Sequence, residues 1–294
     1  ERFRFELINT SREPGICLNW PLDANDTDFD LRLTDFKSDA QVDQMGAMKK
    51  FFSDWGMASA GDYDLESMPG GGVPRWSFPE VSEDAQKGEV PDPPKDKSGQ
   101  PVAEAAIESF DFGAKSELRV TCVLKDGREI IGLMKGEGGG QELVRLPKRA
   151  GPDWVAEKWR KEHDVMNLAA NDDDEKVAGQ KDNGDGFTLY EEYRGWVEKG
   201  RHITGDPKRK DFFILNLIDA DARGGVALFE RLSKLRVHSR LRDGKEMSQE
   251  ERLMNGNHRD APHRVQQHGV AISHAASGAG GYNVGVEGVD KSKA

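Results

Sequence analysis

A stretch near residue 190 carries oxygen-bearing groups at the spacing that a hard cation such as Ca²⁺ requires. Ca²⁺ binds about six to eight oxygen atoms, and acidic or amide side chains at alternate positions of a tight loop present them from one side. A glycine at the sixth of about twelve loop positions permits the sharp turn. With Gly186 at that position, the expected ligands are the side chains of Asn183 and Asp185, the carbonyl group of Phe187 and the side chain of Glu192.

Two positions of this loop depart from the pattern. Lys181 stands at the first position, so either Asp182 or a carboxylate from residues 172–174 replaces the missing ligand, or the site is weak. Leu189 at the ninth position offers no side-chain oxygen, which leaves that place to water. The alternative is a glycine-rich turn whose acidic residues are solvated. The predicted metal ligands are Asp182, Asn183, Asp185, Phe187 and Glu192.

Residues 184–196 resemble the EF-hand-like, thrombospondin type 3-like calcium loops of large bacterial extracellular proteins. Those loops commonly read Asp-Gly-Asp-Gly-Leu-Thr followed by Tyr-Glu-Glu-Tyr. Residues 152–159 resemble the helix after an earlier loop of such proteins, although residues 146–150 lack the side-chain ligands of that loop. The resemblance covers about residues 146–215. It implies a structural calcium ion, an extracellular or cell-surface location, and no chemistry at the loop.

Helices and a strand must position this loop. Tyr190, Tyr193, Trp196 and Val197 predict a short exiting helix that ends at Gly200. The apolar run 212–218 predicts a buried strand. A second amphipathic helix is predicted from the spacing of Val226, Phe229, Leu232 and Leu235.

The rest of the chain predicts smaller modules. Strand-period alternation marks residues 2–8 and 29–33, and helical spacing marks 41–55. Prolines and charged residues over 81–101 predict a linker. Three further strands are expected at 118–124, 129–134 and 143–146, the first two joined by a turn at 126–127.

The expected fold class is α+β with several modules. These are an N-terminal α/β unit (1–80), a linker (81–101), a small β-sheet unit (102–147), an EF-hand-like calcium-binding region with a following strand and helix (148–255), and a Gly/His-rich tail (256–294).

Composition limits the partners. The 294 residues carry 42 basic and 53 acidic side chains, a formal net charge of −11, which argues against binding nucleic acid through a basic face. No stretch approaches the about 18 apolar residues of a membrane span.

Cys17 and Cys122 are either two thiols or one disulfide. Because the chain begins at Glu1 without a leader, we expect a mature or excised segment of a longer protein.

Histidines concentrate near the C-terminus and raise a second hypothesis. Four of the seven, His258, His263, His268 and His274, lie within seventeen residues, but steps of five do not align them on one helical face. The sequence therefore predicts a calcium-stabilised extracellular structural, adhesion or assembly protein without catalytic residues, acting through protein partners or self-assembly. The alternative is a metal-dependent hydrolase, or an accessory domain of one, that uses the histidine-rich segment.

Overall fold

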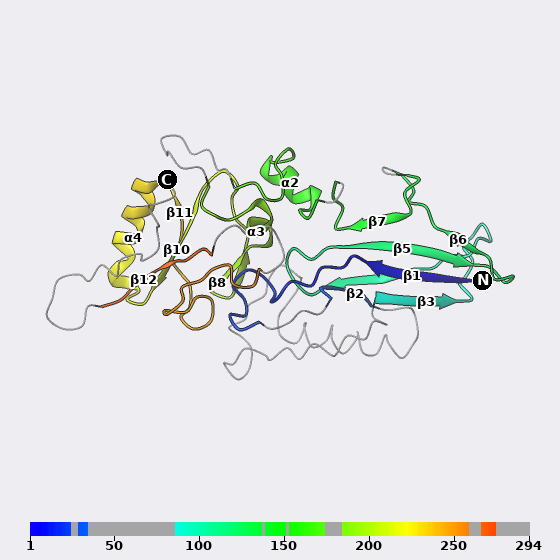
Figure 1. Ribbon diagram of the computed structural model, residues 1–294, viewed down its shortest axis with the longest axis horizontal. Helices are drawn as coiled ribbons and strands as arrows, with labels where there is room; N and C mark the ends of the chain where they lie inside the picture. The colour runs from blue at the N-terminus through cyan, green and yellow to red at the C-terminus, as the bar shows by residue number, and fades with distance from the viewer. Residues whose placement is uncertain are drawn as a thin grey trace.

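The computed structural model describes residues 1–24, 29–34, 86–136, 139–150, 153–173, 184–258 and 266–274. It is a mixed α+β structure with mostly strands, few helices and several small sheets, which confirms the predicted class at that level. The strands of the largest sheet form one end of an elongated molecule and α4 forms the other, with α2 and α3 between them (Figure 1). The predicted helix at 41–55 lies outside the described residues.

The largest sheet is built around strand β1 (Arg2–Ile8), as its alternating pattern predicts. It pairs antiparallel with β3 (Lys87–Pro91) on one side and β5 (Ser116–Val123) on the other. Strand β5 also pairs with β6 (Glu129–Ile131) and β7 (Leu143–Leu146). The strands expected near 118, 129 and 143 are therefore confirmed.

One face of this sheet is covered by a two-stranded ribbon. Strands β2 (Leu31–Thr34) and β4 (Ala106–Ser109) pair antiparallel, and Leu31 and Leu33 pack with Phe5 and Leu7 of β1 in one buried cluster. Period-two alternation places these leucines on the same side of their strand, so the ribbon buries its apolar face against the sheet.

The segment 81–101 contains a strand where the sequence predicts a linker. Within it, β3 pairs with β1 over five residues, with Val90 opposite Phe3 and Pro91 opposite Arg2. A strand at the sheet edge gains backbone hydrogen bonds from one neighbour and needs little apolar surface, and it tolerates proline. Strands from the predicted segments 1–80, 81–101 and 102–147 thus share one sheet.

The other end of the molecule holds short helices and two small sheets. Its elements are α2 (Glu157–His163), α3 (Leu189–Arg194), β8 (Trp196–Glu198), β9 (Arg201–Ile203), β10 (Asp211–Asn216), α4 (Ala220–Ser233), β11 (Arg236–His238) and β12 (Val270–Ile272). Strand β10 lies between β11 and β12 and runs parallel to both, as its apolar run predicts for a buried strand.

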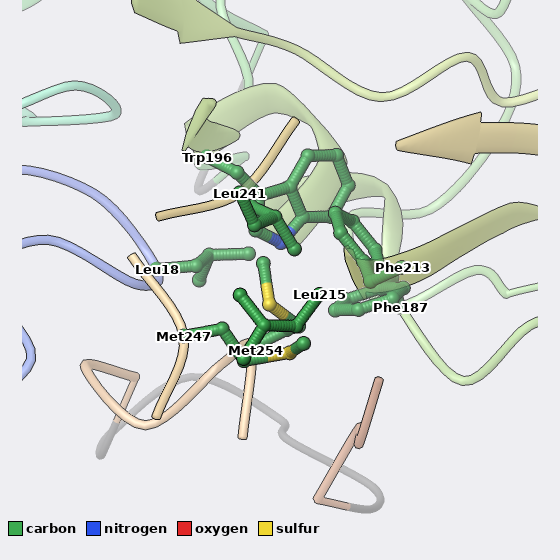
Figure 2. Close-up of a cluster of buried hydrophobic side chains, with 8 residues drawn as sticks. All are labelled: Leu18, Phe187, Trp196, Phe213, Leu215, Leu241, Met247 and Met254. Carbon is green, nitrogen blue, oxygen red and sulfur yellow. The ribbon is translucent and has the colours of Figure 1, made fainter. Parts of the chain in front are cut away.

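The helix predicted to end at Gly200 instead ends at Arg194. Gly195 adopts φ 73°, and a Cβ there would lie 2.1 Å from the carbonyl oxygen of Ile203, so only glycine permits the change of direction. Trp196 then starts strand β8. It packs in a buried cluster with residues from distant segments: Leu18, Phe187, Phe213, Leu215, Leu241, Met247 and Met254 (Figure 2).

The predicted helix after β10 is confirmed as α4, but its apolar residues do not form a buried face. Val226 is 9% exposed, whereas Phe229 is 39% and Leu232 69% exposed. Among the described residues, no helix is long and apolar enough to cross a membrane. Cys17 and Cys122 are both free thiols.

Candidate functional site

The predicted calcium loop leads into helix α3 through a complete capping box. The side chain of Thr188 accepts a hydrogen bond from the backbone N–H of Glu191, and Glu191 Oε2 accepts one from the N–H of Thr188 at 2.8 Å. Glu191 Oε1 also accepts a hydrogen bond from Asn255 at 2.8 Å. The first glutamate of the tandem pair therefore caps the helix and belongs to the scaffold.

Glu192, the predicted twelfth-position ligand, is buried in α3 next to Gly205. It is 1% exposed, and its backbone carbonyl accepts a hydrogen bond from the N–H of Gly205 at 2.8 Å. A Cβ on Gly205 would lie 2.5 Å from the Cβ of Glu192, so this close approach requires glycine.

Asp185, the predicted fifth-position ligand, fastens the loop to two other segments. Its Oδ1 accepts a hydrogen bond from the N–H of Phe187 at 3.0 Å, and its Oδ2 accepts one from the N–H of Asp211 at 2.5 Å. Its carbonyl oxygen accepts a hydrogen bond from the side chain of Gln267. The loop is thus joined to the start of β10 and to the segment before β12.

A third carboxylate, that of Asp173, reaches the same loop. Its Oδ1 accepts a hydrogen bond from the N–H of Gly186 at 3.0 Å. A Cβ on Gly184 would lie 2.0 Å from the carbonyl oxygen of Asp173, so the two segments approach as closely as glycine allows. The sequence leaves several replacements open for the ligand at the first loop position. One of them, a carboxylate from residues 172–174, lies next to the loop in the structure.

Asp211, which the sequence analysis did not single out, contributes a buried oxygen. Its Oδ1 lies 2.6 Å from Nε2 of His238 and 3.7 Å from Nε of Arg236. Its Oδ2 is buried and has no hydrogen-bond partner among the described residues. His238 stacks on the ring of Phe213 and lies 3.6 Å from Glu198. The local signal that could have identified this position is an acidic residue directly before a buried apolar run.

We call Asp173, Asp185 and Asp211 the acidic cluster, because the charges of Asp173 and Asp211 act on Asp185. The pKa of Asp185 is raised to about 7, chiefly by burial and also by the negative charges of Asp211 and Asp173, against the hydrogen bonds from the backbone N–H groups of Phe187 and Asp211. The pKa of His238 is raised, because its contacts with Asp211 and Glu198 outweigh burial, which alone would lower it. Buried like charges of this kind require a proton or a cation.

The donor set fits a hard cation in its chemistry, because carboxylate oxygens are the ligands that Ca²⁺ prefers. Within the described ranges, no group of three or more His, Cys, Asp or Glu residues could hold a metal ion by itself. Asp182 and Asn183 lie outside those ranges. The predicted ligand set therefore extends beyond the described residues.

The described histidines of the C-terminal segment lie in different surroundings. His258 is buried, with Nδ1 3.7 Å from Glu13. Nδ1 of His268 lies 2.8 Å from the carbonyl oxygen of Glu251, and the exposed His274 lies 3.9 Å from Asp221. Each of the three histidines thus contacts a different element; His263 lies outside the described residues.

A second set of buried charges surrounds Arg194, the last residue of α3. Arg194 is fully buried and donates hydrogen bonds to the carbonyl oxygens of residues in three other segments: Pro14, Gly15, Phe112 and Asn257. Its Nη2 also lies 3.4 Å from the carboxylate of Asp111. We call Glu13, Asp30, Asp111, Arg194 and His258 the Arg194 cluster.

Burial is the largest influence on the pKa of each acid in the Arg194 cluster. Burial raises the pKa of Asp30 to about 7 and that of Asp111 well above its usual range. For Glu13, burial is again the largest influence, but the contacts with His258 and Arg194 outweigh it and lower the pKa. The Arg194 cluster joins the loops beside the large sheet to α3, so we interpret it as a structural junction.

Comparisons with protein-family models, with curated proteins and with solved structures find no match for this chain.

Proposed function

We propose that this chain binds Ca²⁺ at the loop 181–192, and that it serves as a calcium-stabilised structural, adhesion or assembly protein outside the cell. The observation that carries the proposal is the acidic cluster beside α3. There the negative charges of Asp211 and Asp173 act on the carboxylate of Asp185, and Asp211 has a buried oxygen, Oδ2, with no hydrogen-bond partner among the described residues.

The roles of the residues follow from their contacts. Asp185 holds the loop against the start of β10, and Asp173 holds the preceding segment against the loop glycines. Asp211 adds a buried oxygen from the strand side. Together with the predicted ligands Asp182, Asn183, Glu192 and the carbonyl of Phe187, they form an oxygen-rich set. When bound, Ca²⁺ neutralises these carboxylates and cross-links the segments that carry them.

The stabilisation expected from this site is modest. Lys181 at the first position and Leu189 at the ninth reduce the number of charged ligands. The dissociation constant should therefore fall in the weak extracellular range, on the order of 10⁻⁴–10⁻³ M. Ca²⁺ at about 1 mM would then stabilise the fold by about 0.4–1.4 kcal/mol. Sites of such affinity are typical of extracellular modules, which is the location that we propose.

The experiment is calcium titration by calorimetry, combined with thermal unfolding in Ca²⁺ and in chelator. We expect wild type to bind Ca²⁺ and to unfold at a higher temperature with it. In Asp185→Asn the calcium-dependent shift should vanish, whatever the variant's stability in chelator.

Asp30→Asn is the matched control for this experiment. Asp30 is also a buried aspartate whose pKa is raised to about 7, but it belongs to the Arg194 cluster. Its variant should keep the calcium-dependent shift. An equal shift in Asp185→Asn and wild type, no calcium binding by wild type, or binding of Zn²⁺ through the histidine-rich segment instead would overturn the proposal.

A further inference from the structure

The outward face of helix α4 carries exposed apolar side chains that no other described element covers. Leu228 is 46% and Leu232 69% exposed, while Val226 on the inner face is 9% exposed. The helix forms the end of the molecule farthest from the N-terminal end of β1 (Figure 1). Two exposed leucines one helical turn apart form a continuous apolar stripe, because residues four apart share one helix face.

The same face carries two glycines in the middle of the helix. A Cβ added to Gly224 or to Gly225 would meet no described atom within 4 Å. Glycine within a helix is destabilising relative to alanine. No packing among the described residues therefore requires the small residue at either position.

The charges at the two ends of α4 are complementary to those of a second, antiparallel copy of the helix. Asp221 lies in the first turn of α4, 3.9 Å from the exposed His274, and Arg231 lies in the last turn. In an antiparallel pair of identical helices centred at the level of residue 226, Asp221 of each helix faces Arg231 of the other. A parallel pair would instead place Asp221 beside Asp221 and would align the two helix dipoles unfavourably.

We propose that α4 is a self-association surface that pairs antiparallel with α4 of a second copy of this chain across a two-fold axis. In that register, Leu228 of one copy lies over Gly224 and Gly225 of the other, and Leu232 lies near Ala220. The contact is isologous: each copy supplies both the leucine and the glycine side. This inference does not rest on the calcium site.

The contact is small, so the dimer is weak. A single pair of helix faces buries less than the about 1,200 Å² of total area at which stable interfaces begin, and we expect a dissociation constant on the order of 10⁻⁵–10⁻⁴ M. Such a contact suits a chain that assembles at high local concentration or through several attachment points.

Sedimentation equilibrium of the full chain, from about 5 to about 500 µM, tests the proposal. Wild type should pass from monomer to dimer. Leu228→Glu should weaken dimerisation about thirtyfold or more. Gly224→Ala should raise the stability of the fold yet weaken the dimer, because the added methyl group obstructs the facing leucine. A rise in fold stability together with a loss of dimer affinity would distinguish a docking role from a folding defect.

Leu133→Glu is the matched control, because Leu133 is 63% exposed at the other end of the molecule and should leave dimerisation unchanged. A charge swap tests the orientation. Arg231→Asp should weaken the dimer about tenfold, and Asp221→Arg combined with Arg231→Asp should restore it. A wild-type protein that stays monomeric at about 500 µM, a dimer insensitive to Leu228→Glu, or a double variant no better than Arg231→Asp alone would overturn the proposal.

Discussion

Two buried acidic clusters lie at opposite ends of the short helix α3, and they differ in how their charge is compensated. The Arg194 cluster contains three acids around a guanidinium supplied by the helix itself. In the acidic cluster at the other end, the charges that act most strongly on Asp185 are those of Asp211 and Asp173, both negative. Arg236 and His238 reach this cluster at one oxygen, Oδ1 of Asp211.

Helix α3 therefore lies next to two buried clusters that differ in the source of their compensating charge. Where the chain supplies its own cation, buried acids join distant segments around it, although the pKa values of Asp30 and Asp111 are still raised by burial. Where buried acids depend on protons or on a dissolved cation, the same kind of cluster makes local stability depend on the solution. A positive side chain at the C-terminal end of α3 and carboxylates near its N-terminal end also agree with the direction of the helix dipole.

The largest effect should come from removing the internal cation. Arg194→Met leaves three buried acids without their shared partner and breaks hydrogen bonds to three segments, so we expect a loss of about 3–5 kcal/mol in the free energy of unfolding. Urea denaturation measures it. Arg128→Met, which removes an exposed arginine paired with Asp126, should change stability by less than about 1 kcal/mol. Equal losses in the two variants would contradict the assigned junction.

Acid should weaken the same junction through His202. Its ring stacks on Phe112, Nε2 lies 2.7 Å from the carbonyl oxygen of Arg194, and burial lowers its pKa from 6.5 to about 4. Since the folded pKa lies below the unfolded value, the neutral ring stabilises the fold above pH 6.5, and this contribution is lost as pH falls towards 4. The shift corresponds to roughly 3 kcal/mol. His202→Gln should flatten the stability profile between pH 4 and 6.5 in urea denaturation.

The contribution of Asp30 to stability should change with pH in the opposite direction to that of His202. Burial raises its pKa to about 7, above the unfolded value of 3.8, so the protonated form is favoured in the fold. This contribution is complete below pH 3.8 and is lost as pH rises towards 7. Asp30→Asn should therefore be more stable than wild type at pH 8, by about 1–2 kcal/mol, with the difference shrinking towards pH 4. A variant less stable than wild type at pH 8 would show that Asp30 is fully compensated by Arg194.

The sequence predicts the parts of this comparison that are local. Alternation over residues 2–8 gives β1, and the apolar run after Lys210 gives β10. The loop is recognisable because its ligand types recur at fixed short intervals. The premature end of α3 is not, because it depends on Gly195 meeting the carbonyl oxygen of Ile203, a contact that no periodicity encodes.

Long-range contacts explain the rest of what the sequence did not predict. Arg194 reaches the carbonyl oxygen of Pro14 across 180 positions and that of Asn257 across 63. Asp211 meets Asp185 across 26 positions. Each residue alone is an ordinary surface type, so nothing marks it as buried until the strands are paired. The apolar spacing of α4 likewise predicts a helix but does not distinguish a core face from an exposed one.

The smallest effect tests which carboxylate replaces the missing first ligand of the calcium loop. Asp173→Asn keeps an oxygen that can accept the hydrogen bond from the N–H of Gly186, so the loop should stay in place, but it removes one negative charge beside Asp185. Calcium affinity, measured by calorimetry, should fall about three- to tenfold, because affinity follows the charge of the ligands. Asn171→Ala, two positions earlier, should leave affinity unchanged. If Asp173→Asn binds Ca²⁺ as tightly as wild type while Asp182→Asn does not, the first ligand comes from within the loop, and Asp173 serves only to hold the loop glycines.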